Sequence, residues 1–122
     1  MKLRVRQQSV RFRLSPEDVA SLGRGESVIM TLCLGPNQRF TYGLKVAQLA
    51  SIGVESTSSG VVILCPADLV KHLAETEEVG FERVIEFGEG DSLRVLVEKD
   101  FQCLVPRGED DGNTFPNPNA KP

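Results

Sequence analysis

Two hairpin signals limit this chain to a fold rich in short strands. Apolar residues alternate with others over residues 28–34 and 40–46, and residues 35–37 (Gly-Pro-Asn) separate the two runs. Such alternation is typical of strands that bury one face, and the intervening residues favour a turn. We expect a hairpin here with a loop of roughly four residues. The even-numbered residues of both runs should face the core.

A second hairpin is predicted near the end of the chain. Residues 88–91 (Gly-Glu-Gly-Asp) separate the runs 81–87 and 93–98. The two glycines permit the positive φ that a tight hairpin requires. A weaker strand is expected at residues 52–56, followed by a polar hairpin loop at residues 57–60.

Two short helices are predicted between the strands. Residues 15–18 (Ser-Pro-Glu-Asp) begin the first, because Ser caps a helix, Pro suits its first turn and acids favour the positive end of the dipole. Gly23 or Gly25 ends it. Residues 61–65 are apolar without alternation, as in a strand buried on both faces. Pro66 then opens the second helix, which extends to Glu75 or its neighbours.

These elements predict an α+β fold that is mostly β. We expect about eight mainly antiparallel strands and two short helices, in a barrel-like or two-layer arrangement. The length of 122 residues suits one domain. Residues 1–105 are assigned to a single strand-rich domain. Apolar periodicity stops after that, so residues 106–122 are interpreted as an acidic, proline-containing tail.

The opening residues carry the most distinctive chemistry of the sequence. Basic and apolar residues alternate in residues 2–6 and again in 10–14, but the apolar parity moves from odd to even. A bulge or tight turn must therefore lie at residues 7–9. Five cations stand on the non-core positions of these strands: Lys2, Arg4, Arg6, Arg11 and Arg13.

Arginines spread over the face of a sheet suit phosphate or carboxylate, which they bind through two parallel hydrogen bonds. The candidate anion site consists of Arg4, Arg6, Arg11 and Arg13. Two other interpretations stay open. The charges could simply protect an edge strand from aggregation, or they could pair with acids elsewhere in the fold.

A charged triplet ends the last predicted strand. Residues 98–100 (Glu-Lys-Asp) follow the apolar run 93–97 and precede Phe101, which we expect to be buried. Charges held between a buried strand and a buried ring require partners. The candidates for structural ion pairs are Glu98, Lys99 and Asp100. If the sheet closes, its first and last strands become neighbours, so these acids should lie opposite Arg4 or Arg6.

No catalytic or metal-binding constellation emerges. The soft metal ligands are Cys33, Cys65, Cys103 and His72, and none of them form a close pair. Zinc sites usually contain such pairs, so no metal or cofactor is predicted. Cys33 and Cys65 are in strands expected to be buried, where cysteine acts as a small hydrophobe. No sequence feature joins a nucleophile to a base.

Composition restricts the partners and the compartment. An odd number of distant cysteines argues against a secreted disulfide scaffold, and no apolar run approaches the roughly 20 residues that span a bilayer. The start of the chain is charged and unlike a signal peptide. We therefore expect a cytoplasmic protein without a membrane segment.

Charge is divided unevenly along the chain. Residues 1–45 carry 8 basic and 3 acidic residues, and residues 46–122 carry 6 basic and 14 acidic ones, for a net charge of -3. Either the basic part meets an anionic partner, or the two parts attract each other in the fold. The negative net charge and the lack of interleaved aromatic residues argue against nucleic acid.

The ends of the chain carry two specific motifs. These are Lys2-Leu-Arg-Val-Arg with Ser9-Val-Arg-Phe-Arg-Leu, and Leu93-Arg-Val-Leu-Val-Glu-Lys-Asp-Phe with Phe115-Pro-Asn-Pro. With these motifs the chain resembles, over nearly its whole length, a family of small bacterial proteins of unknown function. Its alternating charges are similar more loosely to the triphosphate tunnel enzymes. Residues 2–6 lack the Glu-x-Glu-x-Lys opening of those enzymes, so their metal chemistry is not implied.

Taken together, these features predict a non-catalytic binding or interaction module, whose partner is a small anionic ligand or a protein. The alternative is a small enzyme or binder that acts on a phosphorylated or polyanionic ligand through the basic opening strands.

Overall fold

A computed structural model describes residues 1–55 and 57–101. These residues form eight strands and two helices, which confirms the predicted α+β class dominated by strands. In chain order the elements are β1 (Lys2–Arg6), β2 (Ser9–Leu14), α1 (Pro16–Gly23), β3 (Val28–Gly35), β4 (Gln38–Ala47), β5 (Gly53–Val54), β6 (Gly60–Pro66), α2 (Ala67–Glu75), β7 (Gly80–Gly88) and β8 (Asp91–Lys99).

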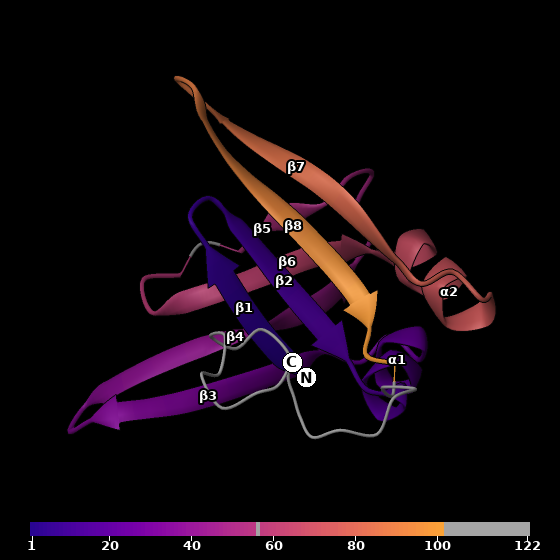
Figure 1. Ribbon diagram of the computed structural model, residues 1–122, viewed down its shortest axis with the longest axis horizontal. Coiled ribbons are helices and arrows are strands. Elements are labelled where there is room, and N and C mark those ends of the chain that lie inside the picture. Colours follow the sequence, from indigo (N-terminus) through magenta and orange to yellow (C-terminus); the bar gives the residue numbers. More distant parts are fainter. Residues whose placement is uncertain (56, 102–122) are drawn as a thin grey trace, which may run out of the picture.

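The strands form two mixed sheets packed as two layers (Figure 1). Sheet A has the order β1-β2-β8-β7, and sheet B has the order β3-β4-β6-β5. Four pairings are antiparallel hairpins, whereas β2–β8 and β4–β6 are parallel. The two-layer prediction is confirmed. Within the described residues no closed barrel forms, so the barrel alternative and the likeness to tunnel enzymes both fail.

The element order repeats within the chain. Two strands, a helix and two strands occupy residues 2–47, and the same order recurs in residues 53–99. Exchanging the halves turns β1-β2-β8-β7 into β5-β6-β4-β3, which is the order of sheet B read backwards. Each sheet therefore combines one hairpin from each half. The parallel pairs join the halves, so neither half contains a complete sheet.

The core lies between the two sheets. Phe12 and Val95 from sheet A and Leu44 and Ile63 from sheet B are fully buried. Burial of each such side chain contributes about 1.5–3 kcal/mol. The helices lie side by side at one end of the layers (Figure 1) and pack against each other. The buried core consists of Val10, Phe12, Leu14, Leu22, Leu44, Ile63, Cys65, Val70, Leu73, Val95 and Val97.

Local sequence explains the first hairpin and the first helix. Gln7 and Gln8 form a two-residue turn that pairs Arg6 with Ser9, so the parity change reflects the predicted tight turn. Ser15 caps α1: its hydroxyl oxygen accepts a hydrogen bond from the Asp18 amide, and the Asp18 carboxylate accepts one from the Ser15 amide. This reciprocal box satisfies two backbone donors that a helix start would leave unpaired.

Other predictions require correction. The β3–β4 loop contains two residues, Pro36 and Asn37, instead of about four. Met30 and Leu32, expected in the core, are exposed because their hairpin extends past the overlap of the sheets (Figure 1). Phe101, expected to be buried, is 62% exposed. The predicted tail at residues 106–122 lies outside the described residues, as does the end of the domain assigned to residues 1–105.

Candidate anion-binding face

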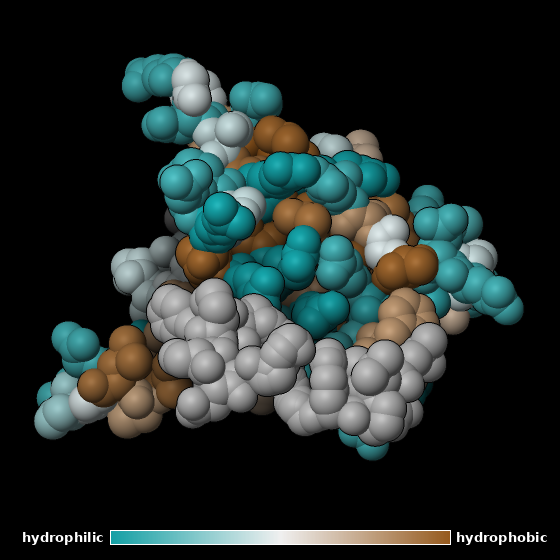
Figure 2. Space-filling view, viewed as in Figure 1, coloured by the Kyte–Doolittle hydropathy of each residue, from teal (hydrophilic) through white to brown (hydrophobic). Residues whose placement is uncertain are grey.

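Strand register gathers the predicted arginines on one face of sheet A. Lys2 lies opposite Arg13, and Arg4 lies opposite Arg11. Residues directly opposite each other in a sheet share a face. The apolar partners of the same hairpin, such as Leu3 and Phe12, take the other face and pack in the core. The basic face therefore points away from sheet B, and Figure 2 shows a mainly hydrophilic surface there.

Strand β8 extends this face with further charges. It pairs in parallel with β2, which places Arg94 opposite Ser9 and Glu98 opposite Arg13. The expectation that the first and last strands are neighbours was wrong, because β2 lies between β1 and β8. Glu98 of β8 consequently meets Arg11 and Arg13 of β2 and not the arginines at positions 4 and 6.

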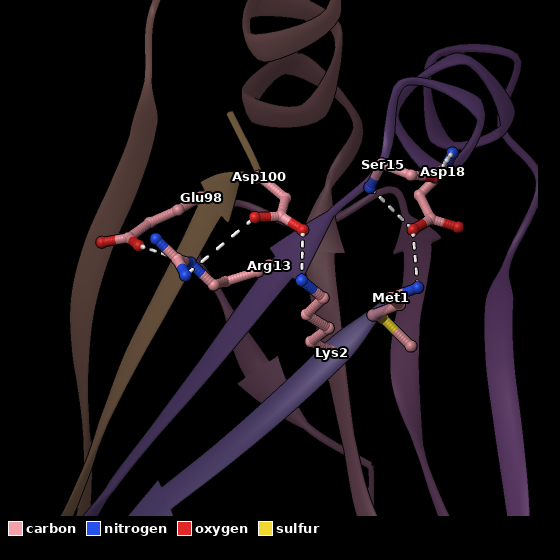
Figure 3. A network of polar contacts seen from close by, with 7 residues as sticks. All are labelled: Met1, Lys2, Arg13, Ser15, Asp18, Glu98 and Asp100. Atoms are coloured by element: carbon pink, nitrogen blue, oxygen red, sulfur yellow. Dashed lines mark hydrogen bonds and ion pairs between the residues drawn. The ribbon is translucent and has the colours of Figure 1, made fainter. Parts of the chain in front are cut away.

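At one end of the face the charges are compensated (Figure 3). Glu98 Oε1 lies 3.7 Å from Arg11 Nε and 3.9 Å from Arg13 Nε. Asp100 lies 2.9 Å from Lys2 Nζ and 4.0 Å from Arg13 Nη1. Lys99 takes no part in this network, since its Nζ donates to the Thr76 carbonyl at 3.0 Å.

A further carboxylate lies beside this end of the face. Asp18 Oδ2 is 3.0 Å from the amino group of Met1, and the same carboxylate accepts from the Ser15 amide (Figure 3). Burial alone would raise the pKa of Asp18. The hydrogen bond from the Ser15 amide, the amino group of Met1 and the Ser15 hydroxyl outweigh that effect, so the pKa lies below its ordinary value.

At the other end of the face lies an open groove of about 570 Å³. Its cationic lining comes from three strands: Arg6, Arg11 and Arg94. Gln8 lies in the turn. Its side-chain amide donates to the Ser92 carbonyl at 2.8 Å, and its backbone carbonyl accepts from the Arg94 backbone amide at 2.9 Å. These two hydrogen bonds hold the β1–β2 turn against β8 and so fix the position of one side of the groove.

The arginines of this end are only partly compensated. Arg94 forms an ion pair with Glu82 of β7, and Arg11 has the distant contact with Glu98. Arg4 and Arg6 take part in no ion pair with any residue that the structure describes. Sequence reasoning found Arg6 and Arg11 but missed Arg94. No local pattern connects that residue to β2, because the parallel pairing of β2 with β8 is not visible in the sequence.

The residues that line the groove all lie in a segment that matches a known protein family. Residues 1–119 match the sequence model of a family described as "Family of unknown function (DUF7009)". The chain belongs to this family. No curated protein and no solved structure matches the chain. The expected resemblance to a family of unknown function is confirmed.

This DUF7009 member has a second concave surface, between α2 and β7, that the sequence reasoning did not identify. The cleft has a volume of about 680 Å³. Its ionisable lining residues are Asp68, His72, Arg83 and Glu86, and its apolar ones include Leu49, Ile52 and Ile85. The spacing of Asp68 and His72 puts both on one face of a helix, which was an available signal. Among the described residues, none of these four side chains forms an ion pair. The Arg83 guanidinium donates to the Glu82 carbonyl and lies over the Phe81 ring.

The cysteines divide between core and surface. Cys65 is buried, and burial raises the pKa of its thiol to about 12, so the thiol stays protonated. Cys33, which was expected to be buried, is exposed and accepts a hydrogen bond from Arg39 Nη1 at 3.0 Å. Cys103 lies outside the described residues. Within those residues no three or more His, Cys, Asp or Glu side chains are grouped as metal ligands would be.

No helix formed by the described residues is long and apolar enough to cross a membrane.

Proposed function

We propose that the protein is a non-catalytic binding module that holds a phosphorylated or polyanionic small ligand in the groove of sheet A. One observation carries the proposal: guanidinium groups from three strands line one open groove, and Arg6 among them forms no ion pair with any described residue, whereas Lys2 and Arg13 at the other end of the face are both matched by carboxylates. If the arginines served only to protect an edge strand from aggregation, they would not need to gather around one groove.

The chemistry of the groove suits phosphoryl oxygens. Each guanidinium can present two parallel N–H donors to one phosphate, and Ser92, whose hydroxyl is a further potential donor, also lines the groove. The Ser9 hydroxyl already donates to the Arg6 carbonyl at 2.9 Å. Glu82 would compete with the ligand for Arg94. Affinity should therefore fall steeply as salt screens these exposed charges.

A binding role without catalysis is supported by the distribution of reactive groups. The groove contains serine hydroxyls, but His72, the single histidine of the chain, lines the other cleft. General base catalysis needs a base within hydrogen-bond reach of the nucleophile or the attacking water. A small enzyme acting on the same ligand is the alternative, and the assay below distinguishes it.

We also infer a bacterial, cytoplasmic protein. The resemblance of both end motifs supports the origin, and the location is supported by two free cysteines, Cys33 and Cys65, one of them exposed. An exposed thiol is typical of a reducing compartment. Fractionation of the native host followed by immunoblotting would test this location, and recovery of the protein from a secreted or membrane fraction would contradict it.

Thermal shift and titration calorimetry test the ligand class. The probes are inorganic phosphate, pyrophosphate, triphosphate and ATP, each with and without magnesium. A ligand present at 100 times its dissociation constant should stabilise the fold by about 2.7 kcal/mol. Because a hydrogen bond to a charged group contributes about 1.5–3 kcal/mol, Arg6→Ala and Arg94→Ala should each lower affinity about tenfold or more.

Arg4→Ala is the matched control, since Arg4 is on the same strand and face as Arg6 but does not line the groove. Equal losses for Arg4→Ala and Arg6→Ala would mean general electrostatic attraction and would contradict a site. Absence of stabilisation by every probe would overturn the proposal. Release of phosphate from a bound polyphosphate, lost in Arg6→Ala, would favour the enzyme.

A further inference from the structure

Strand β3 differs from the other edges of the two sheets. It is the outer strand of sheet B, eight residues long, and none of its residues is charged. Met30 is 42% exposed and Leu32 is 51% exposed. In the register these two residues lie opposite Tyr42 and Phe40 of β4, so an apolar face continues across the projecting hairpin. Figure 2 shows hydrophobic surface at this projection.

The other three edges in the described part of the chain are protected. An open edge exposes unpaired backbone N–H and C=O groups, and natural proteins usually blunt it with charges or keep it very short. β1 has Lys2, Arg4 and Arg6, and β7 has Glu82, Arg83 and Glu86. β5 is two residues long. Among these four edges only β3 is long, mostly apolar and without charge, so it is the edge best suited to pair with another strand.

We propose that β3 of one copy pairs antiparallel with β3 of a second copy, which joins the two B sheets into one continuous sheet. The argument is charge matching. An uncharged strand with an apolar face is complemented by another such strand, whereas β1 or β7 of a second copy would place three charges against β3. The other face of β3 carries Thr31 and Cys33, and Arg39 of β4 donates to Cys33 Sγ there. Among the described edges only β3 fits β3.

Self-pairing of β3 is also compatible with the alternation of side chains along the strand. A twofold axis at Thr31, perpendicular to the sheet, makes each residue face a residue of the same sheet face, so Met30 of one copy faces Leu32 of the other on the apolar side. The outward backbone groups of both strands gain partners at the same time. The groove of sheet A lies on the other layer and stays open, so this inference is independent of the proposed ligand.

Sedimentation velocity over a dilution series of the full chain tests the pairing, together with hydrogen exchange of the β3 amides at high and low protein concentration. We expect a dimer that dissociates on dilution, with β3 amides protected more at high concentration. Leu32→Lys places an ammonium group against Met30 of the other copy on each side of the twofold, and should weaken the dimer about tenfold or more.

Val84→Lys is the matched control, because Val84 is 53% exposed in the edge strand β7 of the other sheet. It should leave the dimer unchanged. Met30→Lys provides a second test if Leu32→Lys fails to fold. A chain that stays monomeric at all concentrations overturns the proposal, as does an equal effect of Leu32→Lys and Val84→Lys. Protection of β3 that does not depend on concentration would also overturn it, since another part of the same chain would then be the cover.

Discussion

The two halves of the chain use the same order of elements but stabilise them differently. In the first half, α1 begins with a reciprocal cap between Ser15 and Asp18, and the amino group of Met1 adds a third contact. In the second half, α2 begins directly after Pro66 without any side-chain cap. The first half thus fixes its helix by polar contacts. The second fixes its helix by packing, through Val70 and Leu73.

Charge is divided between the halves in a similar way. The cations of β1 and β2 come from the first half, and the carboxylates that meet them, Glu98 and Asp100, come from the second. This arrangement supports the interpretation that the two parts of the sequence attract each other. It also shows that equivalent strands need not share a role: β7 is an edge with three charges, whereas β3 has none.

The largest expected effects test whether the halves fold as one unit. Phe12 on β2 and Ile63 on β6 occupy the central strands of opposite sheets and are fully buried. Phe12→Ala should cost about 3–5 kcal/mol of unfolding free energy and Ile63→Ala about 2–5 kcal/mol. Because the parallel pairs join the halves, each variant should unfold in a single transition. Denaturant unfolding followed by two probes, such as circular dichroism and tyrosine fluorescence, measures this.

Two separate transitions in either variant would contradict that expectation and would mean that each half is stable alone. Val5→Ala is the control, because Val5 is 59% exposed on the edge strand β1. It should change the free energy of unfolding by less than about 0.5 kcal/mol.

A smaller effect on stability should distinguish the N-terminus of α1 from that of α2. Asp18 has a folded-state pKa below its ordinary value, so its charge stabilises the fold above the unfolded-state pKa of about 3.9. That contribution is lost as pH falls through the lower folded-state value. Asp18→Asn should therefore cost about 1 kcal/mol at pH 7, as loss of a cap does, and the difference from the wild type should shrink in acid.

The matching change in α2 is Asp68→Asn, which removes a first-turn acid that has no capping bond. It should cost less than Asp18→Asn at pH 7. Urea unfolding from pH 2.5 to 7 compares the two variants. If they lose equal stability, or if the loss in Asp18→Asn does not depend on pH, the helix starts do not differ as described.

Features encoded by neighbouring residues could be predicted from the sequence. The cap at Ser15, the turn at Gln7 and Gln8, and the hairpin around Gly88 and Gly90 depend on local backbone preferences, and all three were found. The parallel pairings could not be predicted, because they join strands that are distant in sequence. For the same reason Met30 was assigned to the core: alternation shows which residues share a face, but not where the opposite sheet ends.

The candidate site was predictable to the same extent. Alternation placed four arginines on one face, since parity is a local property. It could not divide them between an open groove and a compensated end, because that division depends on Arg94 and Glu98 of β8 and on Asp100, which directly follows β8. The acids were recognised as ion-pair candidates. Their expected partners, Arg4 and Arg6, were wrong, since β2 separates β1 from β8.

The smallest expected effect tests this correction directly. Arg13 and Glu98 face each other across β2 and β8, at 3.9 Å and with half-exposed side chains, whereas Arg4 is one strand further away. Exposed pairs of this kind contribute about 0–1 kcal/mol, because water and salt screen them. A double-mutant cycle of Arg13→Ala and Glu98→Ala should give a coupling of about 0.5 kcal/mol that decreases in 1 M salt. The same cycle with Arg4→Ala should give none within error. Coupling of Glu98 to Arg4 and not to Arg13 would instead require β1 and β8 to be neighbours. That arrangement would contradict the strand order of sheet A, and with it the groove that Arg6 and Arg94 line together.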